Sequence, residues 1–150
     1  MTAEEDPRSI RRILVALDAS PHSVAALEAA AELAAAAGAE LRGFFVEDVD
    51  LLRAGALPIA REVEYFSGRL RDVDTRDLEL QLRARARRVR QLLERTASRR
   101  GVAFSFDSVR GRVTAELSSA AADVDLVAVG VVGHSRRRGP GSAVRALLEA

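Results

Sequence analysis

The sequence predicts an α/β fold: an open, mostly parallel, twisted sheet with helices on both faces. Two observations predict it. Short apolar segments alternate with longer segments of helical periodicity along most of the chain, and two of the short segments are apolar throughout. Strands without polar positions are typical of parallel sheets that helices cover on both sides. A length of 150 residues suits one domain with one core.

The first predicted strand follows a polar segment, residues 1–10, which we expect to be loosely structured. Residues 13–17 read Ile-Leu-Val-Ala-Leu and predict a strand buried on both faces. The apolar block ends at Asp18. Residues 39–46 are the next strand candidate, so the chain opens with a strand, helix, strand unit, which is parallel and right-handed in nearly all proteins.

The helix of this unit has recognisable signals at both ends. Ser20 followed by Pro21 predicts its start, because a serine side chain caps free N–H groups and proline fits the first helical position. Gly38 predicts its end just after Ala37. One face should be buried, with Val24, Leu27, Ala31 and Ala34 on it.

Residues 47–74 interrupt this alternation and are interpreted as an insert in a domain that spans residues 11–150. The segment mixes acidic and apolar residues without a regular period, which is typical of a lid, a partner surface or a mobile connection. Its apolar part, residues 51–59, is compatible with core packing and with a dimer surface.

A long helix is predicted from Thr75 to Gly101. Its opposite, arginine-rich face includes residues 83–100, with eight arginines and one acid, Glu94. We interpret that face as solvated and paired with the acidic insert, and we do not expect nucleic-acid binding because no stacking aromatic residues accompany it. The predicted buried stripe is Leu78, Leu82, Ala86, Val89, Leu93 and Thr96.

The remainder of the chain continues the alternation. Residues 102–106 alternate like a half-buried or edge strand, and a helix is predicted near 112–122. Residues 125–130 form the second apolar strand, whose apolar run begins at Leu126, and Ser142 begins a last helix that continues to Ala150. We expect the two fully apolar strands to be the central pair, so that a ligand crevice opens in the loops after residues 17 and 129.

The loop from Gly130 to Ser142 has the composition of an anion site. Its glycines let backbone N–H groups approach an anion, and it leads to a helix N-terminus, where unpaired N–H groups favour phosphate. Arg136, Arg137 and Arg138 are interpreted equally well as a phosphate clamp or as a solvated loop. On the other loop, Asp18 can accept from a ribose hydroxyl or an adenine amine, or it can cap the helix turn.

Composition excludes several classes of protein and mechanism. The chain has no cysteine and two histidines, so thiolate metal sites, disulfides and cysteine nucleophiles are absent, and no metal site is predicted. All 23 basic residues are arginine, which excludes a lysine-dependent phosphate loop and Schiff-base chemistry. No apolar run is long enough for a membrane span and no secretory signal is seen, so we expect a cytoplasmic protein.

Several segments resemble the universal stress protein family: Ile-Leu-Val-Ala-Leu-Asp-Ala-Ser at 13–20, Gly-Ala-Glu-Leu at 38–41, Phe-Phe-Val at 44–46, and Gly-Xaa-Xaa-Gly followed by Gly-Ser. The resemblance covers most of the chain outside 47–74. It implies an adenine-nucleotide α-hydrolase-like sheet, a homodimer, and ATP binding, with Mg²⁺ as a possible companion. The cofactor-binding residues it implies, together with the arginine loop, are Ala16, Asp18, Val46, Gly130, Gly133, Arg137, Gly141, Ser142 and Ala143.

The sequence departs from the family pattern at two places. Seven residues, 134–140, separate the second glycine from the Gly-Ser pair, two fewer than in members that bind ATP, and one of them is Pro140, which has no N–H. We expect the family's fifth strand not to be present in this chain, which would leave strand 125–130 at an edge. We therefore expect a nucleotide-binding sensor or regulator without required turnover. The alternatives are a non-nucleotide-binding module for dimerisation or partner binding, and a slow ATP hydrolase.

Overall fold

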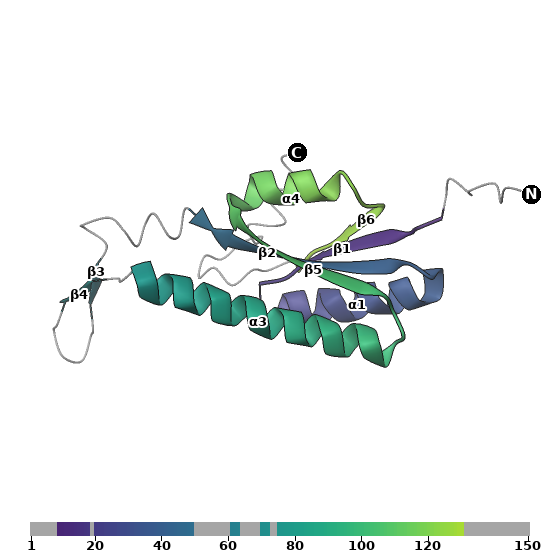
Figure 1. Ribbon diagram of the computed structural model, residues 1–150, viewed down its shortest axis with the longest axis horizontal. Helices are drawn as coiled ribbons and strands as arrows, with labels where there is room; N and C mark the ends of the chain where they lie inside the picture. Colours follow the sequence, from purple (N-terminus) through teal and green to yellow (C-terminus); the bar gives the residue numbers. More distant parts are fainter. Residues whose placement is uncertain (1–8, 19, 50–60, 64–69, 73–74, 131–150) are drawn as a thin grey trace, which may run out of the picture.

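The computed structural model describes residues 9–18, 20–49, 61–63, 70–72 and 75–130 (Figure 1). Their main feature is one sheet of four parallel strands in the order β5-β2-β1-β6. The sheet is open, and with its helices it confirms the predicted α/β class. The strands are β1 (Arg12–Ala16), β2 (Glu40–Asp48), β5 (Phe104–Gly111) and β6 (Leu126–Ala128).

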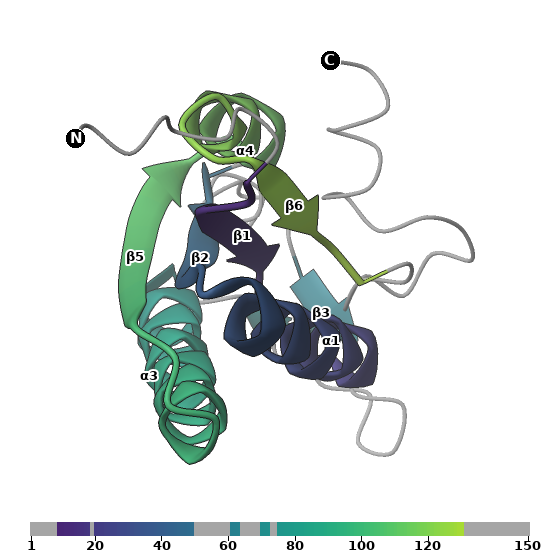
Figure 2. The same ribbon diagram turned by 90° about the vertical axis from the view of Figure 1, so that its right-hand side faces the viewer.

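Helices cover both faces of the sheet, as Figure 2 shows. Helices α1 (Pro21–Ala37) and α3 (Thr75–Arg99) lie on one face, and α4 (Val113–Ala121) lies on the other. The core is divided accordingly. One cluster of buried side chains fills the space between the sheet and α1 and α3, and a smaller one, around Leu14 and Phe44, lies under α4.

Both predicted ends of α1 are confirmed. The side chain of Ser20 accepts a hydrogen bond from the Ser23 N–H at 3.1 Å, and Pro21 occupies the first helical position. At the other end Gly38 adopts a φ of 66°, in the left-handed region, and the N–H of Ala39 donates to Ala34 O. This arrangement is a Schellman motif, which a glycine adopts without steric penalty.

The amphipathic stripe predicted for α3 is also confirmed. Leu82, Val89 and Leu93 are buried against the sheet, as are Ala86 and Thr96, while Leu78 is partly buried. Gly43 of β2 explains how closely α3 approaches. A Cβ at that position would collide with the side chain of Leu93, so the glycine lets the helix lie directly on the strand.

The segment expected to lack regular structure differs from the prediction at two points. Strand β2 continues to Asp48, two residues into the predicted insert. The strands β3 (Arg61–Val63) and β4 (Leu70–Asp72) then pair antiparallel as a small hairpin. Three-residue strands are too short to show a period in the sequence. The apolar part of the insert, residues 51–59, lies outside the described residues, as do residues 1–8 and the predicted last helix.

The edges of the described sheet agree with the predictions. Strand β5 is an edge strand, and it is longer than the predicted 102–106 segment. Strand β6 forms the opposite edge of this part of the chain, and it ends at Ala128, before the predicted residue 130.

Among the described helices, none combines the length and the apolar character that crossing a membrane requires.

One carboxylate ties β6 to the start of β1. Asp125 Oδ2 accepts hydrogen bonds from the backbone N–H groups of Arg11 and Arg12, both at 2.9 Å. These two bonds lower the pKa of Asp125 below its ordinary value. The contact joins residues more than one hundred positions apart and holds β1 and β6 side by side at their amino ends.

Candidate functional site

The direction of the chain reverses between β1 and β6. From β1 the chain passes through α1 to β2 on one side, and from β5 it passes through α4 to β6 on the other side of β1. The pairing of Val15 with Ala128 makes the two strands direct neighbours. The two strands predicted as the central pair are therefore adjacent, although β6 forms an edge of the described sheet and only β1 is an inner strand. Their carboxyl ends form a topological switch point, where open α/β sheets bind their ligands.

The loop after β1 is built around Asp18. Its Oδ1 accepts a hydrogen bond from the Ser20 N–H at 2.9 Å, and its own N–H donates to Ser23 Oγ at 3.4 Å. The Ser23 hydroxyl in turn donates to the backbone oxygen of Ser20. Both serines are buried. The half-buried Asp18 side chain is thus held in a fixed loop by the N–H of Ser20, and Ser20 is the residue that caps α1.

The N-terminus of α1 uses most of its own donors. The N–H of Ser20 binds Asp18, the N–H of Ser23 binds the Ser20 hydroxyl, and Pro21 has no N–H. The N–H of Val24 donates to Ser20 O. Because these N–H groups already have acceptors or are absent, few donors at the start of α1 are left to bind an anion. Phosphate recognition at this edge of the sheet would therefore depend on the loop that begins at Gly130.

Gly130 lies directly against the first turn of α1. A Cβ on Gly130 would be 2.8 Å from the backbone atoms C of His22 and N of Ser23, a separation that no side chain tolerates. The glycine was predicted as a residue that lets an anion approach. The structure adds a packing reason for it: only a residue without a Cβ lets the loop after β6 lie against α1.

Val46 presents its backbone beyond the end of β1. Backbone groups of a strand alternate between its two neighbours, and Phe44 O accepts from Leu17 N on the β1 side. The N–H and C=O of Val46, two residues on, therefore face the same side, past the last paired residue of β1, Ala16. Such a peptide group can read the edge of a base.

Ala16 is placed differently from Val46. Because Arg12 O accepts from Asp125 N, the even-numbered residues of β1 direct their backbone groups toward β6. The half-buried side chain of Ala16, however, packs on the α4 face of the sheet together with that of Val46. The structure therefore brings Asp18, Val46 and Gly130 to one edge, with the side chain of Ala16 at its base.

Five of the predicted site residues lie outside the described residues: Gly133, Arg137, Gly141, Ser142 and Ala143. Within the described part of the chain no three His, Asp or Glu side chains come close enough to hold a metal ion. Ser23 was not predicted as part of the site, although its hydroxyl connects Asp18 to the helix. A serine three residues after a capping serine is the only sequence signal for it.

An open parallel sheet with a topological switch point and helices on both faces defines the doubly wound class of α/β domains. Comparison with known proteins narrows that class. The sequence profile of the universal stress protein family matches residues 9–149, and the chain belongs to this family. No curated protein sequence is significantly similar to it.

Solved structures of this family share the fold. A universal stress protein family member from Burkholderia pseudomallei is 30% identical, with a TM-score of 0.65, over 95% of this chain and 91% of that one. UspA from Lactobacillus plantarum is 20% identical, with a TM-score of 0.63, over 93% and 91%. Hypothetical protein MJ0577 has a TM-score of 0.70 at 19% identity, over 94% and 90%.

Proposed function

We propose that this protein binds an adenine nucleotide, ATP, at the switch point between β1 and β6 and acts as a sensor or regulator in a stress response. The observation that carries the proposal is the arrangement of Asp18, Val46 and Gly130 at one edge of the sheet. The Val46 peptide suits the adenine, and the Asp18 carboxylate suits a ribose hydroxyl.

The phosphates would be held by the loop that follows Gly130, through Gly133, Gly141, Ser142, the N–H of Ala143, and Arg137. Mg²⁺ would accompany ATP as a companion of its phosphates. The Ser23 hydroxyl beside Asp18 donates to the backbone oxygen of Ser20 and not to a base, so the proposal assigns binding rather than turnover. We place the protein in the cytoplasm as a homodimer.

The test is thermal and chemical unfolding with and without ATP. A ligand at a hundredfold its Kd stabilises the native state by about 2.7 kcal/mol, and the shift should follow ATP concentration. Repeating the titration with EDTA tests the role of Mg²⁺, and GTP tests base recognition through Val46. The absence of any shift at millimolar ATP would contradict the proposal.

A second function is favoured by the exposed position of β6. This strand forms one edge of the described sheet, and its three residues are only half-buried. Unpaired strand edges of this kind pair with other chains. An association module would show no ATP stabilisation but a dimeric mass in light scattering, whereas slow hydrolysis would show phosphate release that Asp18→Ala abolishes.

A further inference from the structure

Positive charge is concentrated on α3. Residues 83–100 contain eight arginines and one carboxylate, Glu94, so their net charge is +7. The remaining 132 residues therefore sum to −6, although the whole chain carries +1. Seven of these arginines are exposed: Arg83, Arg87, Arg88, Arg90, Arg95, Arg99 and Arg100. A field of one sign on one surface attracts partners of the opposite charge.

Three carboxylates near α3, among the described residues, are bound by other arginines. Glu47 and Glu79 both bind Arg110 of β5, at 3.0 and 3.3 Å, and these contacts raise the pKa of Arg110. Glu28 of α1 binds Arg99 and Arg100 at 3.0 and 2.7 Å.

The other five exposed arginines of this segment are Arg83, Arg87, Arg88, Arg90 and Arg95. None of them has an ion pair among the described residues. The expectation that this face pairs with the acidic insert is thus wrong for Glu47, the first acid of that segment, which binds Arg110 instead. Figure 1 places the hairpin of the insert beyond the N-terminal end of α3.

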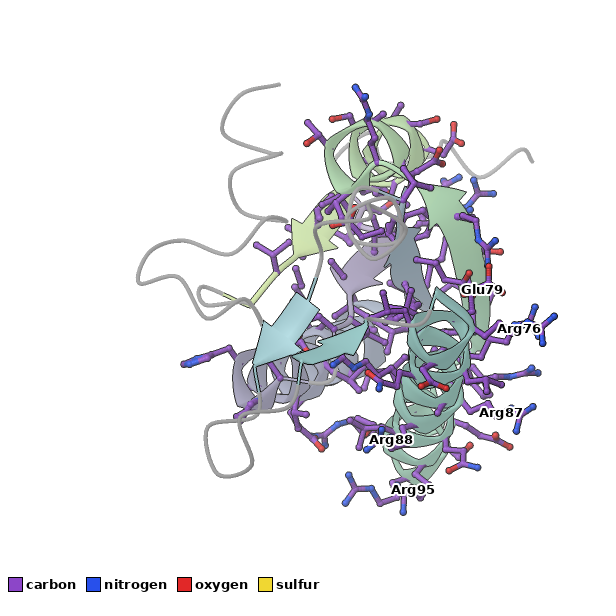
Figure 3. The ribbon with its side chains drawn as sticks, turned by 90° about the vertical axis from the view of Figure 1, so that its left-hand side faces the viewer. Arg76, Glu79, Arg87, Arg88 and Arg95 are labelled. Atoms are coloured by element: carbon purple, nitrogen blue, oxygen red, sulfur yellow. The ribbon has the colours of Figure 1, made fainter. Side chains whose placement is uncertain are left out.

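The five arginines form two rows on the solvent side of α3. At 3.6 residues per turn, Arg83, Arg87 and Arg90 fall in one row, and Arg88 and Arg95 in the other. Figure 3 shows Arg87 extending to one side of the helix and Arg88 to the other. The rows cover about 18 Å of helix, and a helix with its side chains is about as wide as the major groove of duplex DNA.

The composition of this face distinguishes between anionic partners. A protein partner needs apolar anchors, and among the residues of α3 whose burial the structure describes, Leu80 is the one large apolar side chain that is exposed. A membrane surface needs an apolar stripe to insert, and that of α3 is buried in the core. Single strands need aromatic residues for stacking, and residues 75–99 contain none.

We propose that the outer face of α3 binds duplex nucleic acid through its phosphate backbone, without sequence preference. Guanidinium groups suit phosphate because they donate two parallel hydrogen bonds to it, and backbone contacts require only charge and donors. The proposal is independent of the nucleotide site, which lies at the carboxyl edge of the sheet.

Fluorescence anisotropy with a labelled duplex of about 20 base pairs tests it, because each phosphate contact adds about 0.9 to the slope of log K against log salt. The variant Arg83→Gln/Arg87→Gln/Arg90→Gln should lower the slope by about 3 and weaken binding at least about tenfold for every sequence. The matched control is Arg99→Gln/Arg100→Gln/Arg110→Gln, which removes the same charge from arginines that already hold carboxylates. Its slope should stay within about 1 of the wild type.

Three results would overturn the proposal. Wild-type protein that fails to bind duplex even at low salt has no such surface. Equal losses in the two triple variants, both folded by circular dichroism, would mean that net charge alone acts. Tighter binding of a polyglutamate peptide, of anionic vesicles or of a single strand would assign the face to another partner.

Discussion

Gly130 and Ser23 are in backbone contact although more than one hundred residues separate them. A Cβ on Gly130 would lie 2.8 Å from Ser23 N, so the loop after β6 and the first turn of α1 share one packed position. Ser23 also donates to Ser20 and accepts from Asp18. A displacement at Gly130 is therefore transmitted directly to the loop that holds the Asp18 carboxylate.

Gly130→Ala should disturb this contact. The added methyl group meets backbone atoms rather than a flexible side chain, so the strand end or the helix must shift, and we expect a loss of about 1–3 kcal/mol in the free energy of unfolding. The affinity for ATP should fall at least about tenfold, since a shift of this size displaces the proposed site. Urea denaturation and ATP titration measure the two effects.

Gly101→Ala is the matched control. Gly101 has a φ of 66°, and a Cβ there meets no atom within 4 Å. Its substitution costs about 1–2 kcal/mol of backbone strain at the opposite edge of the sheet. ATP affinity should be unchanged in this variant. Equal affinities in both alanine variants would contradict the placement of the site.

Asp18→Asn separates the two roles of Asp18. Asparagine keeps the oxygen that accepts from the Ser20 N–H, so we expect the stability to change by less than about 0.5 kcal/mol. A ribose contact, however, loses its charged acceptor, which should lower ATP affinity about tenfold. Calorimetric titration of ATP, with deoxy-ATP as the comparison ligand, checks this. Unchanged affinity for ATP would leave Asp18 with the capping role alone.

Local chemistry made much of the fold predictable. Ser20, Pro21 and Gly38 mark the ends of α1 because caps act within a few residues, and the stripe of α3 follows from helical periodicity. The adjacency of β1 and β6 was predicted because both are apolar throughout. The hairpin formed by β3 and β4 was missed because three residues carry no period.

The parts that could not be predicted depend on contacts between distant segments. The glycine at 130 suggested an anion site, but its contact with Ser23 exists only once β6 lies beside β1. In the same way, the sequence could not show that Arg110 takes Glu47 and Glu79. The arginines of α3 were assigned to the acidic insert, which begins at Glu47, whereas the sheet register places Glu47 opposite Arg110.

The two hydrogen bonds that Asp125 accepts from the backbone of Arg11 and Arg12 predict that the stability of the protein depends on pH. Because the N–H groups of Arg11 and Arg12 lower the pKa of this carboxyl in the folded state, its contribution is fully present above the unfolded value of 3.8. The contribution is lost as the pH falls through the lowered value. Asp125→Asn should thus be less stable than the wild type at neutral pH, and the difference should shrink in acid.

Urea denaturation over a pH series measures this difference. Asp123→Asn is the control, since Asp123 is exposed two residues earlier and its side chain makes no hydrogen bond within the described residues. Its stability difference from the wild type should not follow the same pH profile. If the stability difference between Asp125→Asn and the wild type stays constant from neutral pH into acid, the charge of the Asp125 carboxylate does not contribute to its hydrogen bonds with Arg11 and Arg12.

Gly43 and Leu93 should be energetically coupled. A methyl group on Gly43 meets the buried side chain of Leu93, so Gly43→Ala should cost about 1–3 kcal/mol through overpacking. Leu93→Ala alone should cost about 2–5 kcal/mol, because it leaves a cavity between α3 and β2. In the double variant the new methyl group enters part of that cavity, so the combined loss should be smaller than the sum of the two, by about 0.5–3 kcal/mol. Urea denaturation of the four proteins measures the coupling, and strict additivity would show that α3 does not rest on β2 at this position.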